Sequence, residues 1–159
     1  MTIPEEHQQD TFSQLVEHPQ SHKETLIAEW VAQVRRDSAV PSKAMTNPEI
    51  VDHIPIVFDA LIQAIKQYRG DTTIEQARQV AAQHTIIRWA ENYDLPAVLR
   101  EISLLRSAFI HYLSDFEDEH EPVDSKARLF TSTTIHIILD EIVLDATELF
   151  LKLRGKDET

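Results

Sequence analysis

Residues 84–106 read as the end of one helix, a tight turn and the start of a second helix. Before the turn, side chains that recur at steps of three and four residues share one helical face, which changes from apolar to charged at His84. Asp94 can then cap a new helix, whose first turn tolerates Pro96 because no backbone donor is needed there. The stretch therefore predicts an antiparallel helical hairpin. The face before the turn consists of Ala77, Val80, Ala81, His84, Ile87, Arg88 and Glu91.

The helix after the turn carries an apolar seam typical of a helical bundle. In an antiparallel hairpin, His84 lies level with Glu101, and Arg88 lies level with Val98. Because buried charges are tolerated only when they are paired and hydrogen-bonded, we expect one mutually satisfied polar cluster, with His84 in hydrogen-bonding reach of Glu101. The expected cluster is His84, Arg88, Glu91 and Glu101, with Arg106 flanking the seam. The seam itself is Leu95, Val98, Ile102, Leu105, Phe109, Tyr112 and Phe116.

The hairpin also resembles a known family. A His-x-x-x-Arg motif at residues 84–88, a Tyr-Asp-Leu turn at 93–95 and a Leu-x-Glu-x-x-x-Leu-Arg motif at 99–106 are similar to the RsbRD-type N-terminal domain. The Val-Pro-Ser element at 40–42 and the Asp-His-Ile-Pro element at 52–55 resemble the same family. The sequence departs from the family pattern at Ile102, where an aromatic residue often follows the glutamate, and at Glu91-Asn92, where a glycine often precedes the aromatic residue.

This resemblance implies a helical sensory module of the kind found at the front of stressosome co-antagonist proteins and of some bacterial histidine kinases. It implies a regulatory input module without catalysis, and it does not supply a ligand. The family normally joins the module to an output domain, so a chain ending at Thr159 either acts on a signalling partner in trans or is a fragment. From the residues alone, a small-molecule- or metal-binding helical bundle is the alternative.

Composition favours one all-α domain over residues 1–159. Two glycines in the whole chain argue against a strand-rich fold and against glycine-built phosphate loops. The absence of cysteine excludes disulfides and thiolate sites, and a formal charge of −12 argues against nucleic acid or anionic membrane as a partner. The N-terminus lacks the features of a signal peptide, and no apolar run is long enough to span a bilayer. We therefore expect a cytoplasmic protein.

The order of elements predicts five main helices and a short N-terminal helix. Residues 1–9 are expected to be disordered or loosely attached, with a short helix at 10–17 that ends before Pro19. A capping box of Ser21 and Glu24 predicts the next helix, which runs to Arg36.

The remaining helices are predicted from caps and proline positions. Asn47 is expected to cap a helix that is kinked at Pro55 and ends at Gly70. The hairpin helices follow, the first starting at 71–73 and the second reaching Phe116. An acidic loop then precedes a long final helix over residues 125–154.

The polar cluster allows several interpretations. It can be a structural layer that fixes helix register, or a sensing site in which His84 changes protonation or a small ligand bridges Arg88 and Arg106. A His–Glu acid/base pair is chemically possible, but no nucleophile accompanies it. The spacings of His111 with Asp115 and of His136 with Asp140 suit metal binding, and His84 or His53 could ligate haem. Because the matching ligands on neighbouring helices are missing, we expect no metal; because the paired charges beside His84 argue against an apolar porphyrin pocket, we expect no haem or other cofactor.

The final helix carries two apolar stripes. One is a bundle seam formed by Ile135, Leu139, Ile142, Ala146, Leu149 and Leu153. The second recurs every seven residues on a different side and consists of Phe130, Ile137, Leu144 and Leu151. A helix that is apolar on two sides is normally buried on both. The second stripe therefore predicts a homodimer interface, with the N-terminal helix as the alternative cover.

Overall fold

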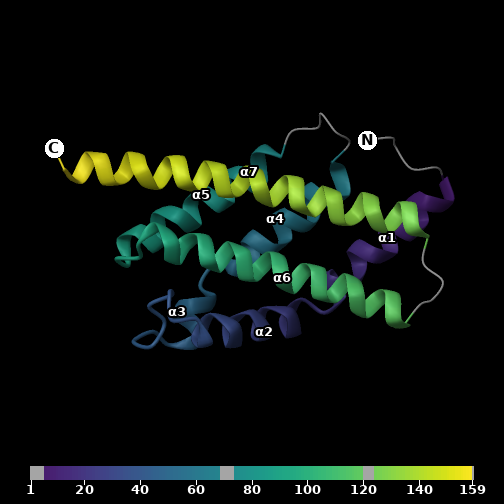
Figure 1. Ribbon diagram of the computed structural model, residues 1–159, viewed down its shortest axis with the longest axis horizontal. Helices are drawn as coiled ribbons and strands as arrows, with labels where there is room; N and C mark the ends of the chain where they lie inside the picture. The colour runs from purple at the N-terminus through teal and green to yellow at the C-terminus, as the bar shows by residue number, and fades with distance from the viewer. Residues whose placement is uncertain (1–5, 69–73, 120–123, 159) are drawn as a thin grey trace.

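The computed structural model describes residues 6–68, 74–119 and 124–158 (Figure 1). In these ranges the chain forms seven α-helices and no strand, which confirms the expected all-α fold with a long C-terminal helix. The helices are α1 (Glu6–Ser21), α2 (Lys23–Arg36), α3 (Asn47–Val51), α4 (Ile54–Gln67), α5 (Glu75–Ala90), α6 (Leu95–Glu119) and α7 (Ser125–Asp157).

The long helix α7 organises the bundle. It packs against α1, α4, α5 and α6, whereas α2 packs against α6 from the other side (Figure 1). One cluster of buried apolar side chains, from Phe12 to Phe150, draws on all of the described helices. The C-terminal end of α7 extends beyond the other helices (Figure 1). None of the described helices is long and apolar enough to cross a membrane.

The hairpin forms as predicted because its turn is locally well specified. Asn92 adopts a φ of 64°, in the left-handed region that asparagine tolerates better than most residues. The amide of Tyr93 donates to the carbonyl of Arg88 over 3.0 Å. Asp94 caps α6, accepting a hydrogen bond from the Ala97 amide over 2.9 Å. Asn92 thus supplies the left-handed backbone conformation on which the turn depends.

The N-terminal region is more ordered than predicted. Helix α1 begins at Glu6, so residues 6–9 are helical, and Pro19 lies inside its last turn rather than beyond it. A proline inside a helix costs about 3 kcal/mol. Burial of three side chains, Phe12, Leu15 and Val16, contributes about 1.5–3 kcal/mol each and outweighs that cost. The predicted capping box is wrong, because Ser21 Oγ donates to the carbonyl of His18 and α2 begins at Lys23.

The region around Pro55 is two helices rather than one kinked helix. The pyrrolidine ring of a proline clashes with the carbonyl four residues earlier, which here belongs to Val51, where α3 ends. The chain turns through Asp52, with a φ of 40°, before α4 starts. Thr46, not Asn47, caps α3 and forms a reciprocal capping box with Glu49.

Two further boundaries differ from the predictions. Helix α6 continues to Glu119, into the acidic segment expected to be a loop, and α7 runs to Asp157 instead of Arg154. The predicted cap at Gly70 and the predicted helix start at 71–73 lie outside the described residues.

Replacing Phe12 with alanine tests whether α1 is part of the core. Its ring packs edge-on against Phe130 of α7 with centroids 5.1 Å apart. We expect Phe12→Ala to lower the free energy of unfolding by about 3–5 kcal/mol in urea titrations, because a buried ring leaves a cavity. Leu129→Ala removes a side chain that is 66% exposed and should change stability by about 0.5 kcal/mol or less. Equal effects of the two substitutions would show that α1 does not cover α7.

Candidate functional site

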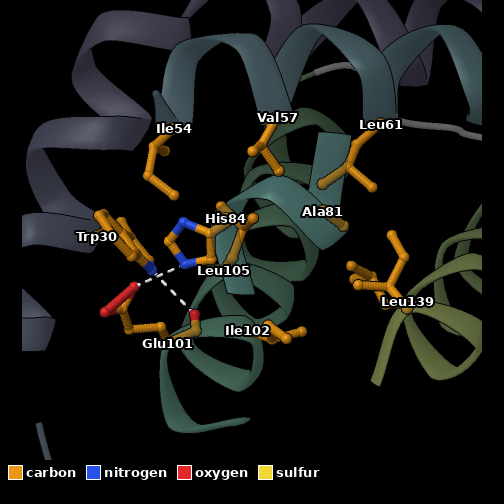
Figure 2. A pocket seen from close by; sticks show the side chains of 11 residues that line it. Trp30, Ile54, Val57, Leu61, Ala81, His84, Glu101, Ile102, Leu105 and Leu139 are labelled. Carbon is orange, nitrogen blue, oxygen red and sulfur yellow. Dashed lines mark hydrogen bonds and ion pairs between the residues drawn. The ribbon is translucent and has the colours of Figure 1, made fainter. Parts of the chain in front are cut away.

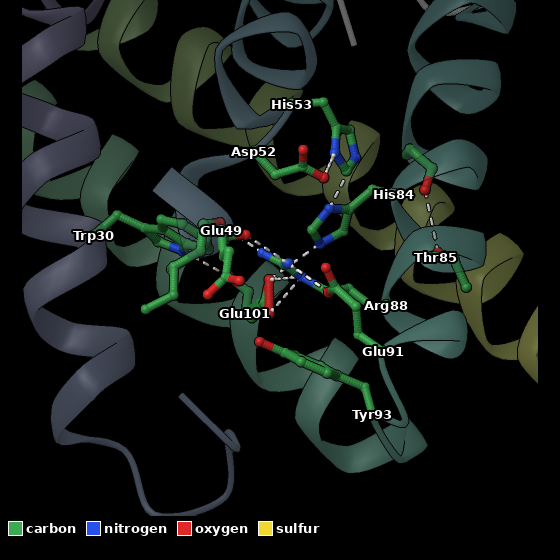
Figure 3. Close-up of polar contacts among 12 residues, drawn as sticks. Trp30, Glu49, Asp52, His53, His84, Thr85, Arg88, Glu91, Tyr93 and Glu101 are labelled. Carbon is green, nitrogen blue, oxygen red and sulfur yellow. Dashed lines mark hydrogen bonds and ion pairs between the residues drawn. The ribbon is translucent and has the colours of Figure 1, made fainter. Parts of the chain in front are cut away.

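A buried ion pair lies at the centre of the polar cluster (Figure 3). The Arg88 and Glu101 side chains are 0% and 1% exposed, and Arg88 Nε lies 3.0 Å from Glu101 Oε1. The same nitrogen donates to Glu101 Oε2 over 3.2 Å. His84 Nε2 lies 3.1 Å from Glu101 Oε2, the proximity expected from the hairpin. Because both charges are removed from water, each depends on the other for compensation.

The Arg88 guanidinium also holds the end of α3. It donates to the backbone carbonyls of Glu49 over 3.2 Å and of Ile50 over 2.6 Å. The last carbonyls of a helix have no partner within the helix, so the guanidinium serves as their cap. A further donation to Glu91 Oε2 over 2.8 Å ties the end of α5 to the same group. Arg88 therefore joins α3, α5 and α6.

The protonation states follow from burial and neighbouring charges. Burial opposes the charge of Arg88, but Glu101 and Glu91 outweigh it and raise the pKa of the guanidinium above its ordinary value. Burial lowers the pKa of His84, and the hydrogen bond that the ring donates to Glu101 only partly offsets this effect. His84 is therefore neutral at pH 7. Since Glu101 can only accept as a carboxylate, His84 Nε2 carries the hydrogen.

Aromatic side chains enclose the cluster. The Tyr93 ring lies 5.1 Å from Arg88 Cζ, and its hydroxyl donates to the sulfur of Met45. Trp30 Nε1 of α2 donates to the backbone carbonyl of Glu101 over 3.0 Å. Burial raises the pKa of Tyr93, so its phenol stays protonated at neutral pH. The cluster is thereby linked to α2 as well.

A small cavity adjoins His84 and Glu101 (Figure 2). Its volume is about 20 Å³, enough for about one water-sized molecule. Apart from those two residues and the indole of Trp30, its walls are aliphatic. They are formed by Ile54, Val57, Leu61, Ala81, Ile102, Leu105, Leu139 and Ile142. A cavity of this size has no room for a metabolite beside the cluster.

Arg106 does not join the cluster. It donates to Asp140 Oδ1 of α7 over 2.7 Å, and the two side chains are 25% and 63% exposed. Residues five apart lie about 140° apart around a helix, so Glu101 and Arg106 face different neighbours. A ligand bridging Arg88 and Arg106 therefore has no common site.

The two histidines considered as metal ligands, His111 and His136, take part in surface contacts instead. His111 and Asp115 form an exposed contact of 3.6 Å within α6. The Arg106 guanidinium contacts both His136 and Asp140. Within the part of the chain that the structure describes, no three histidine, aspartate or glutamate side chains are placed to hold a metal ion.

The main residue that sequence reasoning missed in this site is His53. Its Nε2 lies 3.0 Å from His84 Nδ1, and its Nδ1 lies 2.7 Å from Asp52 Oδ2. From the sequence, His53 was considered as a haem ligand, which we did not expect to find, and as part of the Asp-His-Ile-Pro element, but not as a member of the cluster. The Asp-His-Ile-Pro element at 52–55 held the signal, because a histidine beside a helix-breaking proline occupies a defined turn.

The second stripe of α7 is divided between two environments. Phe130, expected at a dimer interface, is 6% exposed and packs on Phe12, so the N-terminal helix covers that end. Ile137 is partly buried. Leu144 and Leu151 are 62% and 44% exposed. Only the C-terminal part of the stripe is therefore available to another chain.

The fold and the cluster define a helical module whose charged residues are mutually engaged. The family model of the RsbT co-antagonist protein rsbRD N-terminal domain matches residues 24–156. The chain therefore belongs to this family of regulatory domains. No curated protein and no solved structure shows a significant match to it.

The lowered pKa of His84 predicts a specific dependence of stability on pH. Below about pH 6.5 the unfolded chain protonates this histidine while the folded chain does not, so the free energy of unfolding falls as the pH falls. His84→Gln should make this slope shallower by up to about 1.4 kcal/mol per pH unit between about pH 5 and 6.5. Urea unfolding at several pH values measures it, with the exposed His111→Gln as the control. An unchanged slope in His84→Gln would contradict a buried neutral imidazole.

Proposed function

We propose that residues 1–159 act as one non-enzymatic input module of bacterial signalling. The module regulates a histidine kinase or a stressosome-type output, either in the same polypeptide or in a separate partner, and it works in the cytoplasm. The observation that carries this proposal is the family match over residues 24–156, which spans α2 to α7 almost completely.

The chemistry of the cluster supports a role without catalysis. The carboxylate of Glu101 is engaged by Arg88 and His84, and the guanidinium is engaged by two carbonyls and two carboxylates. The adjoining cavity of about 20 Å³ holds no more than a water-sized molecule. A small-molecule- or metal-binding bundle, the alternative function, has less support for the same reasons.

A contact between α5 and α7 can carry a signal out of the cluster. Trp89 follows Arg88 directly, and its ring packs edge-on against Phe150 of α7 with centroids 4.8 Å apart. Arg78 of α5 also pairs with Glu141 over 2.6 Å. Any shift of α5 that follows a change at the cluster therefore acts on the part of α7 that contains the exposed leucines.

The proposed module is a homodimer through the C-terminal part of α7. The large apolar side chains exposed there are Leu144 and Leu151, which are 62% and 44% exposed. With so few large side chains exposed, we expect a dissociation constant in the micromolar range or weaker.

Light scattering over a concentration series tests the dimer. The wild-type chain should approach twice the monomer mass at high micromolar concentration, and Leu144→Glu should remain monomeric because a charge in an apolar interface lacks a partner. Ile56→Glu is the matched control, since Ile56 of α4 is 61% exposed and Leu144 is 62% exposed. A wild type that stays monomeric, or an Ile56→Glu variant that dissociates equally, would contradict the α7 interface.

A further inference from the structure

Four side chains form a continuous line of contacts from the surface to the buried ion pair (Figure 3). Asp52 Oδ2 lies 2.7 Å from His53 Nδ1, and His53 Nε2 lies 3.0 Å from His84 Nδ1. His84 Nε2 completes the line, 3.1 Å from Glu101 Oε2. The line begins at a carboxylate that is 41% exposed and ends at one that is 1% exposed. All three distances lie within hydrogen-bonding range.

Counting hydrogens shows what this line requires. Each carboxylate accepts, so the ring nitrogen facing it must carry a hydrogen. The contact between the two rings needs one more hydrogen on one of its two nitrogens. Three hydrogens on four ring nitrogens are one more than two neutral imidazoles carry, so the fully bonded line contains one imidazolium.

We propose that His53 and His84 together bind one extra proton, held on His53, and that its release frees Asp52 and loosens the turn between α3 and α4. The two-histidine site is thus a proton-binding site that sets the state of this turn. The lowered pKa of His84 agrees with the placement of the charge on the neighbouring ring.

The groups that surround the two rings fit this assignment. From α5 and α6 they face the charged Arg88 and Glu101, and beyond Arg88 lie Glu91 and the protonated phenol of Tyr93. From α2 and α7 the adjoining cavity is lined by Trp30, Leu139 and Ile142, which bring no charge. The only carboxylate in contact with the His53 ring among the described residues is that of Asp52.

The proton is released from the exposed end of the line, where His53 faces Asp52. A ring hydrogen missing between the histidines or at Glu101 would leave buried polar atoms without partners, which is more costly than a loss at the surface. The proton therefore leaves His53 Nδ1 for water, and the lone pair it leaves then faces the Asp52 carboxylate. Repulsion between the two acceptors drives the aspartate away.

Asp52 has a strained backbone conformation that the hydrogen bond from His53 to its side chain helps to hold. Its φ of 40° and ψ of −113°, followed by −98° and 11° at His53, are close to those of a type II′ turn. Glycine is favoured at the first of these positions, so an aspartate there is strained. The turn joins α3 to α4, and Arg88 of the buried ion pair caps α3. Loosening the turn therefore changes the position of α3 relative to the ion pair.

This inference deepens the proposed function by naming proton occupancy as an input, and it rests on that function only for its biological use. The four side chains belong to one chain. Proton binding is therefore measured on the isolated protein, whatever its oligomeric state or output partner.

Nuclear magnetic resonance of the nitrogen-15-labelled chain, residues 1–159, tests the proposal. Long-range proton–nitrogen correlations of the imidazoles are followed between about pH 5 and 8. At the acidic end, both nitrogens of His53 should be protonated and His84 should carry hydrogen on Nε2 only. As the pH rises, His53 should lose the Nδ1 hydrogen. The backbone amide signals of residues 51–54 should shift over the same pH range.

The variant Asp52→Asn separates the switch from simple titration. The asparagine amide can donate to an unprotonated His53 Nδ1, so the pH-dependent shift of the turn amides should be lost while the fold, checked by circular dichroism, is kept. Asp115→Asn, beside His111 in the exposed contact on α6, should retain the wild-type response. A neutral His53 across the range, an imidazolium on His84, or turn amides that do not follow His53 would each overturn the proposal.

Discussion

The ion pair of Arg88 and Glu101 is the constraint on which the rest of this structure depends. Removing two such charges from water costs several kcal/mol for each ion, so the pair persists only with complementary hydrogen bonds around it. The chain supplies these bonds from four helices: carbonyls at the end of α3, His84 of α5, the carboxylate on α6, and the indole of Trp30 on α2, which binds the backbone at Glu101. Each of these helices is therefore positioned relative to one charged centre. An alternative packing of the helices would leave a buried polar group of this cluster unpaired, and that cost makes the observed packing specific.

The same constraint explains which parts could be predicted from the sequence. The hairpin and the proximity of His84 to Glu101 could be predicted because they depend on the three- and four-residue spacing of side chains on either side of one turn. The Asp-His-Ile-Pro element indicates a turn at His53, but the contact of His53 with His84, 31 residues away in sequence, depends on tertiary packing that no local pattern predicts. A ligand bridging Arg88 and Arg106 was one interpretation of the sequence, but the position of Arg106 around α6 directs its guanidinium to Asp140 of α7.

The predicted helix boundaries were wrong where two local signals in the sequence competed. Thr46 and Asn47 can both cap a helix, and the reciprocal bond from Glu49 decides for Thr46. Pro19 normally ends a helix, but burial of the apolar face of α1 overrides it. That tertiary contact also buries Phe130 against Phe12. A heptad repeat alone could not distinguish this intramolecular cover from contact with a second chain.

A double-mutant cycle on the central ion pair is the most direct test of its role. Arg88→Met and Glu101→Gln should each lower the free energy of unfolding by about 3–5 kcal/mol. The first leaves the buried Glu101 carboxylate without a cation, and the second leaves Arg88 only the partly exposed carboxylate of Glu91. The double variant retains neither charge and should cost about 2–3 kcal/mol less than the sum of the two. Loss of the bonds from Arg88 to α3 occurs with or without Glu101 and cancels in the cycle. Additivity within about 0.5 kcal/mol would contradict the dependence of the fold on this pair.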